Sequence, residues 1–289
     1  MSLARNTVVL GQHWEHEMGS TYNKERFAET VRSDYLNRRY ERAMFSLNAS
    51  GQEVLAHRAE TKQLGHPTAL GLPLGGRFTE TMTVGFLDLT DFTRRTFWDG
   101  QDDVVDLAHA VLSGFIEVVD SHGGYPLGLR GDGLFLGFGG NPGFASAMAL
   151  TACTIAIDAI QSEVNPWLKD RGLEPIQARA GLDAGEITFV RTGNVDHSEI
   201  NPLGFAANFA AKCEKKALSW QIVVGEGLVN TLRDQSDFTH HRDSPKTYDR
   251  YGERKYYRFY DFSWKRTLRN SDGVADALRG ASTSSIITS

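Results

Sequence analysis

The sequence predicts an α+β fold of the ferredoxin-like type, with elements in the order β-α-β-β-α-β and a helical extension at the N-terminus. Three observations carry this prediction: an apolar strand that ends at Asp88, a glycine-rich turn at residues 131–133, and long apolar helices between the strands. We expect a helical extension and linker at residues 1–76, a main domain at 77–264 and a disordered tail at 265–289.

The composition of the 289 residues is that of an ordinary globular protein, with 40% hydrophobic and 23% charged residues. A formal net charge of -5 at pH 7 argues against nucleic acid or an acidic membrane surface as a partner. No signal peptide and no apolar run of the roughly 18 residues that a membrane helix needs are evident, so the predicted location is cytoplasmic. Cys153 and Cys213 lie in predicted helices without metal-site spacing, which indicates structural cysteines in a reducing compartment.

The part before the main domain is predicted to contain one amphipathic helix over residues 23–47. Its apolar residues Phe27, Val31 and Tyr35 recur at every fourth position between charged residues. Residues 65–76 are rich in Gly and Pro, which is typical of a linker or of an irregular loop wrapped on the surface.

The first half of the main domain is predicted to contain a strand, a helix and a tight hairpin. The strand covers residues 81–89, and the helix over 102–122 carries one apolar stripe, formed by Val104, Leu107, Ala108, Val111, Phe115 and Val118. Two short strands follow within 125–139, because Gly131 and Gly133 permit the positive φ that a hairpin turn requires.

The second half of the main domain is predicted to begin with a long helix. Asn141 and Pro142 form an N-cap and first-turn pair for this helix, which runs through Ile160. The remaining predicted elements are a strand at 177–190, a helix at 203–217 and a strand at 221–224.

Two carboxylates are expected to meet at one edge of the sheet. Asp88 ends the first strand, and Asp132 lies at the tip of the adjacent hairpin. Such a pair is costly unless a cation lies between the carboxylates, and two Mg²⁺ or Mn²⁺ ions roughly 4 Å apart are the usual arrangement for phosphoryl chemistry. The alternative is that Asp88 caps the following helix and Asp132 only occupies a turn.

Four motifs follow one another between about residues 80 and 235. They are FLDLTDFT at 86–93, GDG at 131–133, GLDAGEITFV at 181–190 and GFAANFAAKCEKKA at 204–217. Their order, spacing and chemistry resemble the catalytic domain of the class III nucleotidyl cyclases. One departure lies in the first motif, where Asp91 stands at a position that is usually Gly in that family.

The resemblance implies a site with two divalent metal ions, Mg²⁺ or Mn²⁺. Asp88 and Asp132 would bind them, with the backbone carbonyl of Leu89 as a further ligand. One ion would lower the pKa of the ribose 3′-OH and the other would hold the triphosphate. The phosphates would also meet backbone N–H groups at the start of a helix, from Thr90, Asp91, Phe92 and Thr93. The implied reaction is cyclisation, with pyrophosphate as the leaving group.

Three later polar residues complete the implied machinery. Asn208 matches the family's ribose-orienting Asn, and Lys212, one helical turn on, replaces the Arg that stabilises charge on the α-phosphate. Lys keeps the positive charge but loses the planar fork of Arg. The alternative for both residues is a solvated helix face. Arg250 is a weaker match to a basic residue that grips the β- and γ-phosphates, and an ordinary surface Arg is the alternative there.

A homodimer follows from the same resemblance. In the family, the metal-binding Asp residues belong to one subunit, whereas the Asn and the cationic residue belong to the other. Because this chain carries both halves, the resemblance implies a homodimer with two equivalent sites and an inactive monomer.

The positions that recognise the base depart from those of the purine enzymes. Gly128 stands where adenylate cyclases carry Lys and guanylate cyclases Glu, and Asn201 stands at the second specificity position. Strand alternation puts Gly128 and Arg130 on one face, so Arg130 narrows the base pocket and offers donors to a carbonyl oxygen. This favours UTP over CTP and over purines. The alternative is that Arg130 pairs with a neighbouring acid and points away from the base.

The whole pattern is similar to that of the pyrimidine cyclases of bacterial antiphage systems, especially the uridylate cyclases. This similarity implies that cyclic UMP is made as a signal for a separately encoded effector. A cyclase-like module that binds a nucleotide or a partner without activity remains the alternative from another class. The motifs HWEHE at 13–17 and GFGGNPG at 137–143 lack the context of a metal or dinucleotide site and are interpreted as loops.

Overall fold

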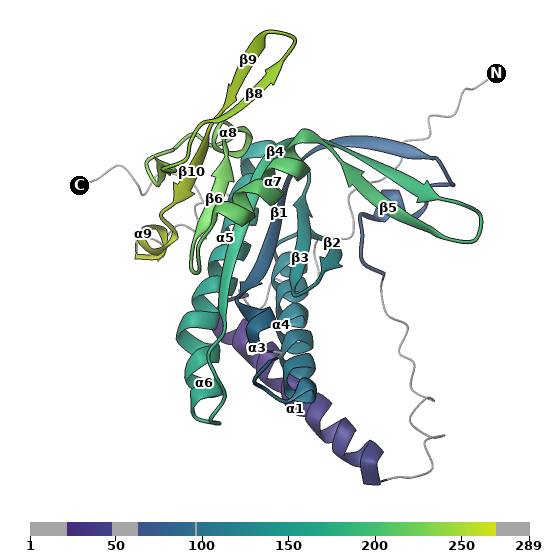
Figure 1. Ribbon diagram of the computed structural model, residues 1–289, viewed down its shortest axis with the longest axis vertical. Helices are drawn as coiled ribbons and strands as arrows, with labels where there is room; N and C mark the ends of the chain where they lie inside the picture. Colours follow the sequence, from purple (N-terminus) through teal and green to yellow (C-terminus); the bar gives the residue numbers. More distant parts are fainter. Residues whose placement is uncertain (1–21, 48–62, 96, 270–289) are drawn as a thin grey trace, which may run out of the picture.

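The structure, a computed structural model, describes residues 22–47, 63–95 and 97–269. The predicted β-α-β-β-α-β unit is present, and its strands are β1 (Arg77–Thr90), β2 (Tyr125–Arg130), β3 (Gly133–Phe138) and β4 (Gln177–Gly193). Their order in the sheet is β2-β3-β1-β4, which confirms the ferredoxin-like arrangement (Figure 1).

The sheet continues beyond β4 with three shorter strands. A parallel strand, β6 (Ile222–Gly225), comes first, and β10 (Phe259–Phe262) and β7 (Phe238–His240) follow it. The central pair is β1 with β4, which run antiparallel from the pair Arg77 and Val190 to the pair Thr90 and Gln177. This pairing places the end of β1 beside the start of β4.

The hairpin between β2 and β3 has the predicted tight turn, but only one of its two glycines has a positive φ. Gly131 has φ +65°, and the turn closes between Arg130 and Gly133. The expectation of a positive φ at Gly133 is wrong. A Cβ at Gly133 would lie 2.6 Å from Asp88 Oδ1, so this glycine instead gives room to the neighbouring carboxylate.

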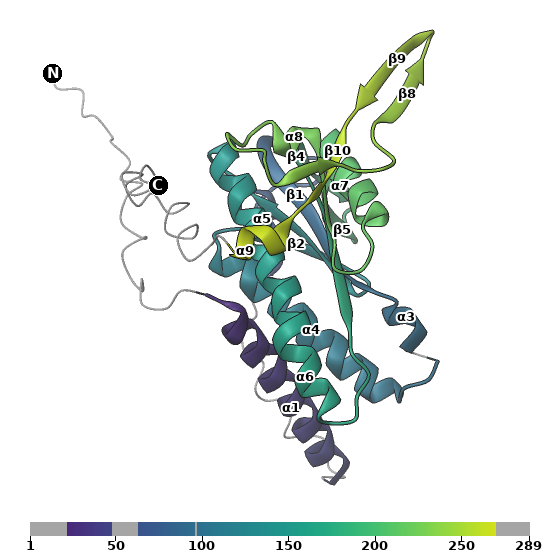
Figure 2. The same ribbon diagram turned by 90° about the vertical axis from the view of Figure 1, so that its left-hand side faces the viewer.

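Three helices, α4 (Gln101–Ser121), α5 (Pro142–Ala159) and α1 (Lys24–Leu47), contribute to one hydrophobic core on one face of the sheet (Figure 2). Within α1, Phe27 is fully buried and its ring lies 6.1 Å from that of Phe115 in α4. The predicted N-terminal helix therefore contributes to the core of the main domain and contacts α4.

The long helix after β3 begins as predicted. The Asn141 side chain accepts a hydrogen bond from the backbone N–H of Phe144 at 3.2 Å, and Pro142 occupies the first turn. After α5 the helix continues through a π-helical turn, Ile160–Val164, into α6 (Asn165–Lys169).

This helical run, Pro142–Lys169, is long and apolar enough to cross a membrane by length and composition. The expectation that no such run exists is therefore wrong. Burial within the protein nevertheless covers 72% of its most apolar window, as in the core helix of a globular fold. Cys153 lies in α5, and both it and Cys213 are free and buried, in keeping with the predicted structural role.

The opposite face of the sheet is covered by α7 (Phe205–Lys216). Alternate residues of β1, Met82 and Val84, point to this face and share a smaller core with Ala206 and Ala210 of α7. The two predicted helices before and after β4 thus lie on opposite sides of the sheet.

Several short elements were not predicted from the sequence. They include α2 (Pro67–Leu70), β5 (Ser198–Leu203), α8 (Glu226–Val229), β8 (Lys246–Arg250) and β9 (Glu253–Tyr257), besides β7 and β10. The strand β5 pairs with the outer half of β4, and β8 and β9 form a separate hairpin that projects from the body of the domain (Figure 1).

The last described element is α9 (Trp264–Arg269), which overlaps the first residues of the predicted tail. Trp264 is 4% exposed, and its indole N–H donates to the carbonyl of Trp220 at 2.8 Å. Farther along α9, the Thr267 hydroxyl donates to the carboxylate of Asp237 at 3.0 Å, so the first residues of the predicted tail also contact the domain. Residues 270–289, like the motif at 13–17, lie outside the described part of the chain.

Candidate active site

The end of β1 presents a partly buried carboxylate. The side chain of Asp88 is 19% exposed and lies between Gly133 of β3 and Arg179 of β4, its two cross-strand neighbours. The same side of β1 carries Val84 and Phe86, so Asp88 continues the row that faces α7. A core strand therefore ends in a charge directed toward α7 and the hairpin.

The second predicted carboxylate lies within electrostatic range of the first. Burial and, next, the negative charge of Asp88 raise the pKa of Asp132 above its usual range. Asp132 follows Gly131 in the turn between β2 and β3, and β3 pairs with the end of β1. The fold thus brings Asp88 and Asp132 together at one edge, where the sequence predicts them.

An arginine and a glutamate that the sequence analysis missed complete this cluster. Arg179 Nη2 donates to Asp88 Oδ2 at 3.2 Å and also pairs with Glu214 of α7. Burial and the charge of Glu214 raise the pKa of Asp88 to about 6, and Arg179 opposes the rise. Only the register of β1 against β4 could have indicated this contact, because 91 residues separate Asp88 from Arg179.

The donor chemistry at this edge fits a divalent cation. Asp88 lies opposite Gly133, the residue after Asp132, and its charge raises the pKa of Asp132. Two carboxylates placed in this way offer the hard oxygen ligands that Mg²⁺ and Mn²⁺ prefer. Among the described residues, no group of three or more His, Cys, Asp or Glu side chains could hold a metal ion. Further ligands at Asp88 and Asp132 would have to be backbone carbonyls, such as that of Leu89, or oxygens of the substrate.

The loop after β1 has an unusual backbone at Asp91, whose φ is +55°. Asp tolerates this left-handed conformation better than most residues, and Gly adopts it at no steric cost. The conformation explains why Asp can occupy a position that is usually Gly in the related motif. The next four residues form a single helical turn, α3 (Phe92–Arg95).

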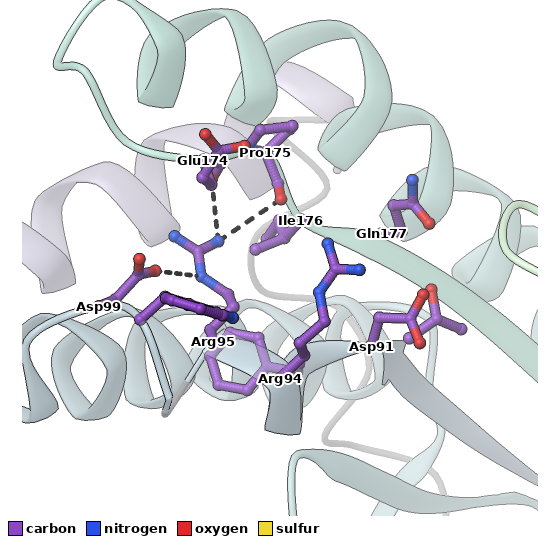
Figure 3. Close-up of a pocket in the computed structure, with 11 residues that line it drawn as sticks. Asp91, Arg94, Arg95, Asp99, Glu174, Pro175, Ile176 and Gln177 are labelled. Carbon is purple, nitrogen blue, oxygen red and sulfur yellow. Dashed lines mark hydrogen bonds and ion pairs between the residues drawn. The ribbon is translucent and has the colours of Figure 1, made fainter.

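A cavity of about 710 Å³ adjoins this loop (Figure 3). One wall is held together by Arg95, which donates to Asp99 at 2.8 Å and to the carbonyl of Glu174 at 2.8 Å. Arg94 extends from α3 into the same cavity near Gln177 (Figure 3). Positive charge therefore stands next to the backbone segment that the sequence assigns to the phosphates.

The two residues expected to act on the ribose and the α-phosphate lie on the outer face of α7. Asn208 and Lys212 are both exposed, whereas Glu214, about 200° around the helix from Lys212, is buried against Arg179. Within one chain, Asn208 and Lys212 therefore point away from the carboxylates that Glu214 approaches. The ammonium of Lys212 instead donates to the hydroxyl of Tyr248 in β8 at 3.0 Å.

The residues expected to contact the base are divided between two places. On β2, a Cβ at Gly128 would lie 3.6 Å from Arg130 Nη1, so these two residues share a face as predicted. Arg130 donates to the carbonyl of Leu129 at 3.0 Å and makes no ion pair within the described residues. Asn201 lies on β5, and the sheet order puts β3, β1 and β4 between it and β2.

Arg250 lies at the end of β8, with its guanidinium 4.9 Å from the ring centre of Tyr251. Tyr251 is 91% exposed at the tip of the projecting hairpin. Within one chain, Arg250 thus lies at an exposed hairpin tip and does not contact the predicted metal-binding residues.

Comparisons with known proteins show which proteins share this fold. No protein-family profile matches the chain. A cytidylate cyclase from Escherichia coli is 25% identical over 179 residues, which make up 58% of this chain and 38% of that protein. The chain therefore matches well under half the length of this curated relative.

Solved structures give the same result at the level of fold. The guanylyl cyclase Cya2 has a TM-score of 0.53 and 21% identity, over 66% of this chain and 94% of its own. The adenylyl cyclase CyaB from P. aeruginosa has a TM-score of 0.53 and 18% identity, over 64% and 95%. A class III adenylyl cyclase-like ATP-binding protein from Pseudomonas aeruginosa has a TM-score of 0.54 and 16% identity, over 61% and 39%. The chain therefore has the fold of the class III nucleotidyl cyclases, the family that its four motifs resemble.

Proposed function

We propose that this protein is a nucleotidyl cyclase, which converts a nucleoside triphosphate into its 3′,5′-cyclic monophosphate and pyrophosphate. The observation that carries the proposal is the meeting of Asp88 and Asp132 at one edge of the sheet, with the pKa of each carboxyl raised. Two carboxylates in this state gain most from a bound cation, because a cation favours the charged form of both.

The metal ions, Mg²⁺ or Mn²⁺, would supply an acidified 3′-OH and charge neutralisation at the phosphates. The chain's own residues would position the metal-binding carboxylate and the substrate. Arg179 holds the Asp88 carboxylate at 3.2 Å, which fixes its direction. Asn208 would orient the ribose, and Lys212 would stabilise the negative charge that develops on the α-phosphate. Because the latter two face outward on α7, we infer that they serve the carboxylates of a second subunit.

The substrate that we propose is a pyrimidine nucleotide, with UTP preferred. Arg130 is free of acidic partners within the described residues and lies over Gly128, so its guanidinium can fill the space of a second ring and donate to a carbonyl oxygen. The similarity to a cytidylate cyclase supports a pyrimidine and makes CTP the competing substrate.

A cyclic nucleotide acts only through a receptor. From the likeness of the motifs to bacterial antiphage uridylate cyclases, we infer that cyclic UMP is an antiviral signal to a separately encoded effector, made by a cytoplasmic homodimer.

The direct test is to incubate the purified protein with UTP, CTP, ATP or GTP and Mn²⁺, and to separate the products by chromatography. We expect cyclic UMP as the main product. Faster conversion of ATP or GTP than of either pyrimidine nucleotide would overturn the assignment of the base and leave only the cyclase assignment.

The role of Arg130 is tested by Arg130→Ala. We expect the specificity constant for UTP to fall roughly ten- to a hundredfold, because a charge-assisted hydrogen bond is worth about 1.5–3 kcal/mol. ATP should gain relative to UTP, because space opens beside Gly128. Arg242→Ala removes an Arg that is 79% exposed on the surface and is the matched control. An unchanged ranking of the four nucleotides in Arg130→Ala would show that Arg130 does not read the base.

A second candidate function is nucleotide binding without turnover. It is favoured by the replacement of the usual Arg by Lys212, and a solved structure of the same fold is described as an ATP-binding protein. Calorimetric binding of a nucleoside triphosphate, without any cyclic product over hours, would decide for this candidate.

A further inference from the structure

The ammonium of Lys212 has a specific partner on the projecting hairpin. Lys212 Nζ donates to the hydroxyl oxygen of Tyr248 at 3.0 Å, and it lies 5.0 Å from the centre of the Tyr248 ring. Lys212 is exposed, whereas Tyr248 is half-buried and packs against a third, small hydrophobic core that includes Phe209 and Phe259. A flexible Lys side chain on an exposed helix face is thus held in one direction.

The position of Tyr248 is itself fixed by packing at the base of the hairpin. The ring of Phe205 in α7 lies 5.8 Å from that of Tyr248 and 4.7 Å from that of Tyr257. The Tyr257 hydroxyl donates to the carboxyl of Asp183 at 3.0 Å and accepts from the backbone N–H of Gly227 at 2.9 Å. These contacts anchor the strand β9 and, through it, the paired strand β8.

The geometry of this contact leaves hydrogen-bond donors free on both partners. The phenol oxygen of Tyr248 accepts from the ammonium, so its own O–H proton remains available. The ammonium of Lys212 keeps two further N–H donors. The two atoms that carry these donors, Lys212 Nζ and the hydroxyl oxygen of Tyr248, lie 3.0 Å apart. The two terminal nitrogens of a guanidinium are likewise neighbouring donors, at a shorter separation.

We propose that Lys212 and Tyr248 act together as a divided substitute for an arginine fork. Lys212 supplies the positive charge, and the Tyr248 O–H supplies the second hydrogen bond to a phosphate group. This inference rests on the proposed function for the reaction that it serves, but it concerns phosphate binding by this pair of residues. It also explains how Lys can replace a bidentate Arg at this position.

The test is a double-mutant cycle with Tyr248→Phe and Lys212→Arg. In Tyr248→Phe, the ring and its packing on Phe205 remain while the O–H is lost. We expect kcat/KM for the preferred nucleotide, and the affinity for inorganic triphosphate with Mn²⁺, each to fall about ten- to a hundredfold. In the Lys212→Arg background, Tyr248→Phe should change either quantity by less than about threefold, because the guanidinium supplies both donors.

Tyr251→Phe is the matched control, because Tyr251 is 91% exposed at the tip of the same hairpin. Wild-type values in Tyr248→Phe would overturn the proposal. An equal loss in both backgrounds would also overturn it, because a purely structural role of Tyr248 predicts that result. If the wild-type chain makes no cyclic product but the triphosphate affinities show the expected coupling, the proposed reaction fails and the phosphate-binding pair stands.

Discussion

At the scale of one residue, Asp91 departs from the motif in a way that the sequence shows but does not explain. The replacement of the usual Gly by Asp is evident from the letters alone. The φ of +55° that makes Gly or Asp suitable there is visible only in the structure. The contact between Arg179 and Asp88 has the same character, because it depends on which residues of β1 and β4 face each other.

Asp183 is a second residue whose environment the sequence does not reveal. It is fully buried on β4 and receives hydrogen bonds from the backbone of Ala184 and from Tyr257. Burial raises the pKa of Asp183 to about 7, against the opposing effect of these hydrogen bonds. At mildly acidic pH, the native protein therefore holds a proton that the unfolded chain releases.

This environment predicts that Asp183→Asn changes how stability depends on pH. An unfolded Asp loses its proton near pH 4, whereas the native Asp183 keeps it until about pH 7. Between these values the native state binds more protons, so this group makes the wild type less stable as pH rises, by at most about 1.4 kcal/mol per pH unit. The Asn variant lacks the contribution and should gain stability relative to wild type from pH 5 to pH 7.

Urea unfolding of both proteins at pH 5 and pH 7 measures this change. Asp196→Asn, at an exposed position in the connection between β4 and β5, is the matched control. A stability difference between Asp183→Asn and wild type that is the same at both pH values would contradict the raised pKa of Asp183.

At the scale of elements, the close approach of α7 to β4 is the contact that positions Asn208 and Lys212. A Cβ at Gly181 would lie 1.9 Å from Glu214 N and 2.5 Å from the carbonyl oxygen of Ala210, both backbone atoms of α7. Only a glycine at this point of β4 allows the helix to lie so near. The glycine-rich character of the strand motif therefore has a packing cause.

This packing predicts that Gly181→Ala destabilises the protein by about 1–3 kcal/mol or more, because α7 must move away from β4. Catalysis should fall as well, since Asn208 and Lys212 move with the helix. Gly185→Ala is the matched control on the same strand, because its Cβ would meet only the Ala206 methyl, at 3.2 Å. Urea unfolding of both variants checks the ranking, and equal stability of the two would contradict it.

Most of the long elements that the sequence predicted have a regular apolar period. The helices α1, α4 and α5 and the strands β1 and β4 bury enough side chains to leave such a pattern. The strands β5, β8 and β9 were missed because nearly all of their residues are exposed or half-buried, so no alternation marks them.

At the scale of the whole molecule, the first helix and the main domain form one body. Phe27, Val31 and Tyr35 of α1 are buried in the same core as α4 and α5. The sequence predicted the apolar stripe of α1 correctly, but the surface that covers it could not be deduced from periodicity. Changes in α1 should therefore affect the stability of the domain that carries the carboxylates.

Within one chain, the predicted site residues lie in two separate groups, which form two halves of a site. Asp88 and Asp132 lie at one edge with Arg179, while Asn208 and Lys212 face outward from α7. We therefore propose that a second copy of the chain brings the halves together. A complete site within one chain would need a different geometry.

Mixing two inactive variants tests this claim most directly. Asp88→Ala removes one half of the site and Asn208→Ala removes the other, and each variant alone should make no cyclic product. When the two are mixed and allowed to exchange subunits, one of the two sites in each mixed dimer has both halves intact. We expect product formation to return in the mixture at up to about a quarter of the wild-type rate, because half of the dimers are mixed and each has one good site. Absence of product from a mixture in which mixed dimers are demonstrated by mass spectrometry would contradict the account.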